Sequence, residues 1–285
     1  MGGAVPVFRS GVPGLVPDAW ILGSDCGPAM PAVVAVHGIT RGVTEMVSHL
    51  APRAVATGRA LVVPHFDVEH WPRYQRAACG NRADWALLRL MAALRAEGQV
   101  GAAPFDLSGF SGGAQFAHRF AWLYPDQVAR LCVTAPGWWT FPDSDVAWPQ
   151  GIRTTGAKEA HGYHLRRNLR QFLDRRIVVC VGSDDTKRDP NLRQGEGIDA
   201  RQGANRLERA RRWCATIEAA AHAHGLQPAI SLRVLQGCSH SFVECVLRAG
   251  LDHDFIQFHS RCVGCAKART CGIDRAMHNI ERTAA

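Results

Sequence analysis

The sequence predicts an α/β protein with a mostly parallel central sheet and helices on both faces. Short apolar, β-branched runs such as 32–36 and 177–181 are typical of strands that are buried on both sides. Longer segments with helical periodicity alternate with these runs, as expected for parallel strands joined by helices. Hydrophobic residues make up 47% of the 285 residues, which is enough for one large core.

The predicted elements follow one another along the chain with few interruptions. The first 30 residues are rich in Gly and Pro and predict a loose arm with one edge strand near 19–22. We expect strands at 32–36, 59–64, 105–110, 128–135, 177–181 and 230–235, and helices at about 45–57, 84–96, 114–124, 204–224 and 241–248. Residues 136–173 lack clear periodicity, and residues 184–202 are polar, which predicts loops in both places.

Composition and charge narrow the range of partners. The net charge is +8, and the stretches 166–176 and 201–212 are rich in arginine, but acidic residues interrupt both. Such mixed charge is typical of a solvated helix face, so we expect no nucleic-acid partner. No apolar run is long enough to cross a bilayer, and residues 1–9 do not resemble a secretory signal, which predicts a cytoplasmic protein with no membrane partner. The oligomeric state stays open.

The stretch around Ser111 carries the strongest chemical signal. Residues 109–113 read Gly-Phe-Ser-Gly-Gly, between a predicted strand and a predicted helix. A Gly-x-Ser-x-Gly pattern in that context predicts a nucleophile elbow, a sharp turn that lifts the serine hydroxyl above the sheet edge. We expect a positive φ at Ser111, close backbone contacts at Gly109 and Gly113, and a free amide at Gly112 where the helix begins.

Two more polar sites follow later strands in the order that a catalytic triad requires. Asp184 and Asp185 come after the strand at 177–181, and His240 comes after the strand at 230–235. The carboxyl ends of parallel strands meet at one edge of the sheet, so these side chains can reach Ser111. His240 is the predicted base. Asp185 is the favoured acid and Asp184 the alternative, since turn geometry is not readable from the sequence.

A fourth site, His37-Gly38-Ile39, closes the first central strand. We expect the backbone amide of Ile39 to act with that of Gly112 as an oxyanion hole. His37 is predicted to be structural, packing under this loop and holding its carbonyl groups. Thr40 and Arg41 are candidates for orienting the loop or for meeting a polar group of the substrate.

These motifs together resemble the α/β-hydrolase fold family. The matching pieces are Val36-His37-Gly38, Gly109–Gly113, Tyr124–Val128, Gly182–Asp185 and Gly237–His240, which span about residues 30–250. Within the superfamily, the chain is similar to bacterial esterases related to polyhydroxyalkanoate depolymerases and feruloyl esterases. The resemblance implies a domain over residues 1–255 with a small insertion at about 138–176, and hydrolysis without a cofactor.

The predicted reaction is hydrolysis of a small-molecule carboxylic ester through an acyl-enzyme. Trp71, Trp138 and Trp139 are candidates for lining an apolar substrate pocket, and packing inside the core is the alternative for each. Two other functions use the same fold: a non-catalytic binding protein, and a lyase or acyltransferase.

The last segment, 256–285, differs in character from the rest. His259, Cys262, Cys265 and Cys271 supply one imidazole and three thiols, a ligand set that Zn²⁺ accepts. The spacing lacks a second Cys-x-x-Cys, so we expect reduced thiols and no metal or other cofactor. Elsewhere Cys132 and Cys180 lie in apolar runs and are predicted to be small buried hydrophobes.

Overall fold

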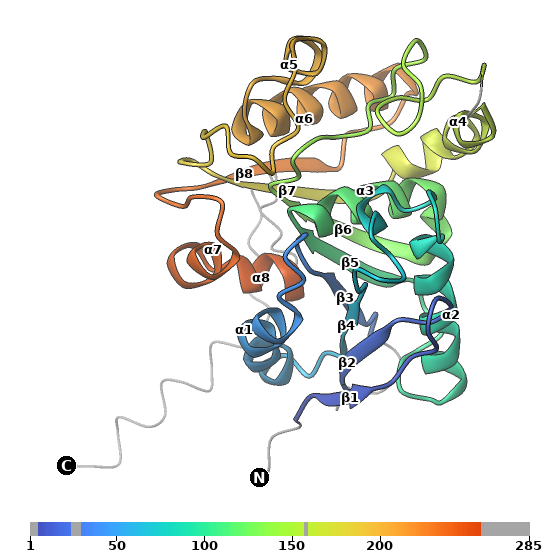
Figure 1. Cartoon of the computed structure of the whole chain (residues 1–285), viewed down its shortest axis with the longest axis vertical. Coiled ribbons are helices and arrows are strands. Elements are labelled where there is room, and N and C mark those ends of the chain that lie inside the picture. Colours follow the sequence, from blue (N-terminus) through green and yellow to red (C-terminus); the bar gives the residue numbers. More distant parts are fainter. Residues whose placement is uncertain (1–4, 24–29, 157–158, 258–285) are drawn as a thin grey trace, which may run out of the picture.

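A computed structural model of the chain describes residues 5–23, 30–156 and 159–257. Eight strands form one sheet in the order β1-β2-β4-β3-β5-β6-β7-β8 (Figure 1). The strands are β1 (Val7–Arg9), β2 (Asp18–Leu22), β3 (Val33–Val36), β4 (Leu61–His65), β5 (Phe105–Phe110), β6 (Val128–Thr134), β7 (Arg176–Gly182) and β8 (Ile230–Leu235). All six strands predicted for the body of the sheet are therefore confirmed.

Strand direction divides the sheet into two parts. From β4 to β8, neighbouring strands run parallel, as the alternation of strands and helices predicts. At the other edge β1 pairs antiparallel with β2, and β2 pairs antiparallel with β4. The strand predicted near 19–22 is β2, but it is not an edge strand, since it pairs with β1 as well as β4. The short β1 beyond it was not predicted, because three exposed or half-exposed residues carry almost no pattern.

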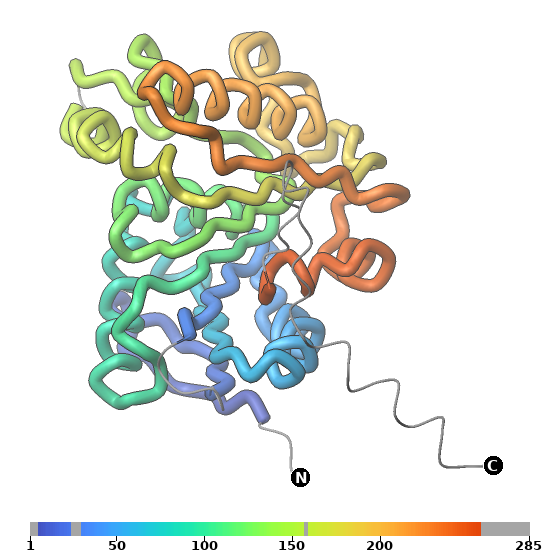
Figure 2. The backbone as a smooth tube through the Cα atoms, turned by 180° about the vertical axis from the view of Figure 1, so that it is seen from behind, coloured from blue at the N-terminus to red at the C-terminus, as the bar shows by residue number. Residues whose placement is uncertain are grey.

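Helices cover both faces of the sheet (Figure 1). The helices are α1 (Val43–Ala56), α2 (Ala83–Ala96), α3 (Gly112–Leu123), α4 (Glu159–Leu173), α5 (Glu196–Gln202), α6 (Arg206–Ala223), α7 (Phe242–Ala249) and α8 (Leu251–Ile256), with single turns η1 (Tyr74–Arg76) and η2 (Pro125–Gln127). α1, α7 and α8 pack together, and α8 lies against β3 and β5. α3, α4 and α6 form a second group over β5 to β8, which is also visible from behind in Figure 2. None of these helices in the described part of the chain is long and apolar enough to span a membrane.

Three helices occupy segments without a predicted helix. α4 replaces part of the irregular stretch 136–173: its buried Leu165, Leu169 and Phe172 form a stripe at helical spacing, diluted by five charged or amide neighbours that hide it in the sequence. α5 lies in the predicted loop 184–202, between Gly195 and Gly203, which both have positive φ. α8 follows Gly250 in a left-handed conformation, which separates it from α7.

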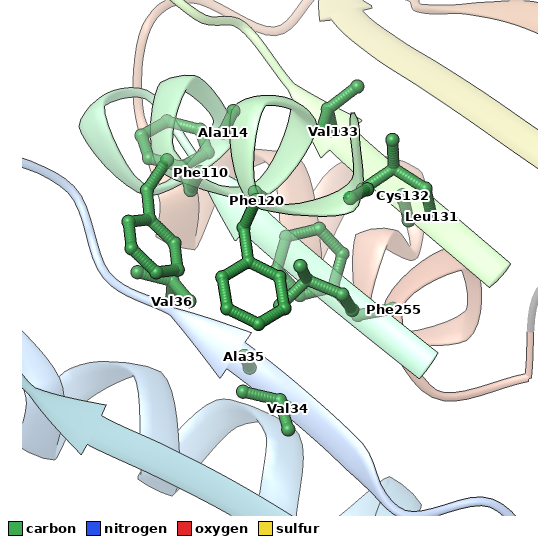
Figure 3. Packing of buried hydrophobic residues seen from close by; sticks show 14 of the residues in the cluster. Val34, Ala35, Val36, Phe110, Ala114, Phe120, Leu131, Cys132, Val133 and Phe255 are labelled. Atoms are coloured by element: carbon green, nitrogen blue, oxygen red, sulfur yellow. The ribbon is translucent and has the colours of Figure 1, made fainter. Parts of the chain in front are cut away.

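The core lies on both sides of the central strand β5. β3 and β5 are buried along their whole length, and Cys132 and Cys180 are buried free thiols, as predicted. Figure 3 shows side chains from β3, β5, β6, α3 and α8 gathered in this core, among them Phe120 and Phe255. Burying one such ring stabilises the fold by roughly 1.5–3 kcal/mol. The carboxyl ends of the strands are therefore anchored in a rigid layer.

Candidate active site

The register of the sheet brings the predicted site residues to one edge. Val36 of β3 pairs with Gly109 of β5, so Ile39 and Ser111 both lie just beyond the ends of neighbouring strands. Gly182 of β7 pairs with Leu235, the last residue of β8. Asp185 and His240 follow those two residues closely, so the loops after β7 and β8 meet beside Ser111.

Ser111 has the strained backbone that the nucleophile-elbow pattern predicts. Its φ is 52°, a left-handed value that costs energy for a residue with a Cβ. The flanking glycines make the turn possible. A Cβ on Gly109 would lie 2.4 Å from the carbonyl oxygen of Gly113, and one on Gly113 would lie 2.0 Å from that of Val36. The α3 helix begins at Gly112, as expected.

Ser111, His240 and Asp185 form one hydrogen-bonded line. The Oγ of Ser111 lies 3.0 Å from Nε2 of His240, and Nδ1 of the same imidazole lies 2.7 Å from Oδ2 of Asp185. The alternative acid, Asp184, does not contact the imidazole: its Oδ1 accepts a hydrogen bond of 2.8 Å from the Ser183 hydroxyl. The geometry therefore brings Asp185 and not Asp184 to His240.

The His240 loop is held from two sides. The imidazole stacks on the ring of Phe110, with 5.2 Å between centroids. Glu244 accepts hydrogen bonds from both the amide and the hydroxyl of Ser239, and Ser241 caps the first turn of α7. Because both neighbours of His240 are tied to α7, the imidazole is presented to Ser111 on a fixed backbone.

The loop at Ile39 comes close to Gly112, the residue that follows Ser111. A Cβ added to Gly112 would lie 3.2 Å from the Ile39 nitrogen and 2.5 Å from its Cγ2 atom. Within the described residues, neither amide donates to another protein group. Two free N–H groups, one of them at the start of α3, are suited to bind an oxyanion.

Arg41 and His37 hold this loop in place. The Arg41 guanidinium donates to the carbonyl oxygens of Ile39, Phe66 and Trp71, at 2.9, 2.8 and 3.4 Å. Buried His37 makes a 2.8 Å contact between Nδ1 and the Gly38 carbonyl, and its Nε2 accepts from the Phe66 amide. Burial lowers the pKa of His37 to about 3, so the ring is neutral at ordinary pH and can accept that bond.

Comparison with solved structures identifies the fold. A poly(3-hydroxybutyrate) depolymerase, LpqC from Bordetella parapertussis, superposes with a TM-score of 0.70 and 25% identity, over 85% of this chain and 84% of that one. The chain has the α/β-hydrolase fold. Poly(aspartic acid) hydrolase-1 from Sphingomonas sp. KT-1 gives a TM-score of 0.70 at 21% identity, over 85% and 95% of the two chains.

A third similar structure is an S-formylglutathione hydrolase from Agrobacterium tumefaciens, with a TM-score of 0.55 and 14% identity over 89% and 95% of the two chains. No protein-family model matches this sequence, and no curated protein matches it either. The likeness to the depolymerase supports an enzyme of the α/β-hydrolase type, as the motifs predict.

The three tryptophans considered for a substrate pocket are buried in this α/β-hydrolase. Trp139 is fully buried and stacks on Trp213 at 4.2 Å between centroids, which agrees with the alternative of packing inside the core. Trp71 is 3% exposed and packs edge-on against Phe66. Trp138 is 6% exposed and lies under the guanidinium groups of Arg119 and Arg193. All three side chains are packed against neighbouring residues, and Trp71 also lines a small cavity with Tyr74 and Cys79.

The arginine-rich stretch 201–212 is only in part the solvated face that the sequence predicts, since Arg201, Arg211 and Arg212 are exposed. Arg206 and Arg209 are both buried in α6. Arg209 pairs with Asp199 and donates to backbone carbonyls, while Arg206 contacts Asp185 and Asp189. Sequence reasoning missed both residues. The available signal was Asn205-x-x-Glu208, a capping pattern that places Arg206 in the first helical turn.

The possible metal ligands of the tail, His259, Cys262, Cys265 and Cys271, lie outside the described residues. The structure therefore does not test the prediction made for these residues.

Proposed function

We propose that this α/β-hydrolase is a serine hydrolase that cleaves a small carboxylic ester through an acyl-enzyme. One observation carries the proposal: the unbroken line from the Ser111 hydroxyl through His240 to Asp185, 3.0 and 2.7 Å per step. A serine hydroxyl is a weak nucleophile until a neighbouring base accepts its proton. The strained elbow and the fixed His240 loop support this pairing.

The first half of the reaction transfers the acyl group to the enzyme. Ser111 Oγ attacks the ester carbonyl carbon while Nε2 of His240 takes the hydroxyl proton. The carbonyl oxygen becomes an oxyanion and accepts hydrogen bonds from the amides of Ile39 and Gly112. When the intermediate collapses, the bond from carbon to the alcohol oxygen breaks, and His240 returns the proton to the departing alcohol.

The second half releases the acid. His240 takes a proton from water, whose oxygen attacks the acyl-enzyme carbon, and the bond to Ser111 Oγ breaks as the proton returns to that atom. Each oxyanion donor lowers the barrier by roughly 3 kcal/mol. Asp185 keeps the imidazole in the tautomer with Nε2 free and stabilises the imidazolium that forms in each half.

The names of the similar structures favour hydrolysis over the other reactions of this scaffold. They include two hydrolases and a depolymerase. Balanced release of acid and alcohol from p-nitrophenyl butyrate separates hydrolysis from acyl transfer, which would place the acyl group on an added alcohol.

A fluorophosphonate probe tests the nucleophile. We expect the wild-type protein to be labelled once and to hydrolyse p-nitrophenyl butyrate, and Ser111→Ala to lose both properties. Ser108→Ala is the matched control: this serine lies on β5, three residues before Ser111, is buried, and its hydroxyl donates to the Phe255 carbonyl. Labelling that persists in Ser111→Ala, or a wild-type protein that is neither labelled nor active, would overturn the proposal.

A further inference from the structure

A buried arginine lies behind the candidate acid of the site. Arg206, the first residue of α6, donates from Nη1 to Oδ1 of Asp185 at 3.2 Å, and both side chains are 1% exposed. The other carboxylate oxygen, Oδ2, is the one at 2.7 Å from His240. The two oxygens of Asp185 thus have different partners, so the carboxylate cannot rotate without breaking one contact.

The start of α6 holds Arg206 in position. Asn205 is the N-cap residue, and its side chain accepts a hydrogen bond of 2.9 Å from the amide of Glu208. Glu208 in turn accepts from the amide of Ala204 at 2.9 Å and from the side chain of Asn205 at 2.8 Å. This reciprocal capping fixes the first helical turn and therefore the base of the Arg206 side chain.

A second carboxylate shares the same guanidinium. The Asp189 carboxylate accepts hydrogen bonds from both terminal nitrogens of Arg206: Nη1 donates to Oδ2, and Nη2 donates to Oδ1 at 3.2 Å. The amides of Asn191 and Leu192 donate to Oδ1 as well. The hydrogen bond from Arg206 lowers the pKa of Asp189 to about 2, so this group stays ionised near neutral pH. Asp189 is also close enough to interact electrostatically with His240.

We propose that Arg206 is a positioning residue for the hydrolytic site, which holds Asp185 in register with His240 and offsets the charge of Asp189. The inference rests on the proposed serine-hydrolase function. With both carboxylates ionised, Asp185, Asp189 and Arg206 together carry one net negative charge, which an imidazolium at His240 balances. Without Arg206, the imidazole faces two negative charges and an acid that is free to turn.

This role belongs to Arg206 and not to buried arginine in general. Arg209 lies three residues further along the same helix and is equally buried, but its partners are Asp199 and carbonyl groups. Arg59 forms a comparable buried pair with Asp106, where Nη2 lies 2.6 Å from Oδ2, and neither residue contacts the site. Arg59→Met therefore matches the loss of a buried arginine without touching Asp185.

The test compares steady-state kinetics on p-nitrophenyl butyrate across a set of purified variants. For Arg206→Met we expect kcat to fall about 10- to 100-fold with KM nearly unchanged, because a displaced acid weakens orientation and not binding. The acidic limb of the pH profile, where kcat/KM falls as the pH is lowered, should move to higher pH. The reason is that two carboxylates without a nearby arginine favour the protonated form of His240. Arg206→Lys should restore most of the pH limb but only part of kcat, since an ammonium cannot form the same fork.

Asp189→Asn provides a variant that is expected to fold, since its side chain is 30% exposed. It removes one negative charge, so the acidic limb should move to lower pH. Adding Asp189→Asn to Arg206→Met restores one net negative charge and should return the limb to its wild-type position. Other charges near the loop, Asp184 and the Glu244–Arg248 pair, are unchanged in every variant.

The outcomes separate the two proposals. A wild-type protein without labelling or turnover removes the proposed function before any variant is compared. If the wild-type protein is active, the positioning role is overturned by an Arg206→Met protein that keeps wild-type kcat and pH limb, or that loses no more activity than Arg59→Met. An Asp189→Asn protein with an unmoved limb overturns the charge-offset part.

Discussion

A buried aspartate paired with arginine lies near each end of β5, but the two pairs differ in what else the carboxylate contacts. At the amino end, buried Asp106 pairs with buried Arg59 and with half-buried Arg130. At the carboxyl end, β5 leads into Ser111, and Asp185 is buried with Arg206. Both regions place an aspartate against guanidinium groups inside the protein, where an unpaired charge would be strongly destabilising.

The difference lies in what the second carboxylate oxygen contacts. Arg130 donates to both oxygens of Asp106, at 2.9 and 2.7 Å, and Arg59 adds a bond of 2.6 Å to Oδ2. At Asp185, arginine takes Oδ1 alone and leaves Oδ2 to the imidazole of His240. A buried ion pair supports chemistry only where the fold leaves one acceptor for a group that gains and loses protons.

The largest expected effect separates the two adjacent aspartates at the carboxyl end. Asp185→Asn should lower kcat by about 10⁴-fold, because an amide holds the wrong imidazole tautomer. Asp184→Asn is its matched control and should keep kcat within about twofold, since Asp184 contacts only Ser183 among the described side chains. Comparable losses in both variants, measured with p-nitrophenyl butyrate, would contradict the assignment of the acid.

At the amino end the expected loss is in stability. Asp106→Asn should reduce the free energy of unfolding by about 3–5 kcal/mol, because two guanidinium groups lose their buried counter-ion. Urea unfolding followed by tryptophan fluorescence measures this change. The folded fraction should keep its kcat, and a selective loss of kcat without loss of stability would break the comparison between the two ends.

Gly112→Ala tests the proposed oxyanion hole, which also lies at the carboxyl end of β5. The new methyl group would lie 2.5 Å from Cγ2 of Ile39 and 2.9 Å from the Tyr74 hydroxyl, so the loop must shift. We expect kcat to fall by about 10²- to 10³-fold, the usual cost of losing an oxyanion donor. Gly23→Ala, where a Cβ meets no atom within 4 Å and the backbone is not left-handed, controls for substitution of glycine and should leave kcat unchanged. Equal kcat in the two variants would argue against an oxyanion hole here.

The smallest expected effect is a change of stability with pH that comes from two buried histidines, His37 and His118. Burial lowers the pKa of His37 to about 3 and that of His118 well below its usual 6.5. The unfolded chain therefore binds more protons below pH 6.5, and stability present above that pH is lost as the pH falls toward 3. Between pH 6.5 and 4.5, His37 alone should cost roughly 2–3 kcal/mol.

Urea unfolding at several pH values measures this slope, and His37→Gln should make it shallower because the amide does not titrate. A wild-type protein whose stability is constant from pH 6.5 to 4.5 would show that neither histidine is kept neutral by the fold.

The elbow was predictable from the chain because its chemistry is local. A strand, a serine between glycines and a helix start are consecutive, and the φ of 52° at Ser111 agrees with the steric argument. The strands of the parallel part were predictable for the same reason, since β-branched runs are read over a few residues. α4 was missed because its apolar stripe is sparse. The role of Trp139 stayed open because an aromatic residue in a loop has the same sequence pattern whether it lines a pocket or packs on Trp213.

Short-range pattern thus decided the fold class, the candidate nucleophile and the identity of the candidate base, since each depends on neighbours a few positions away. The choice between Asp184 and Asp185, and the burial of Arg206 behind the chosen carboxylate, came from the packing of loops after β7 and β8 against the start of α6. Those contacts join residues far apart in the chain, and a side chain's direction at the end of a turn depends on a few degrees of backbone rotation. Only the folded arrangement sets that rotation, because many non-local contacts must be satisfied at once.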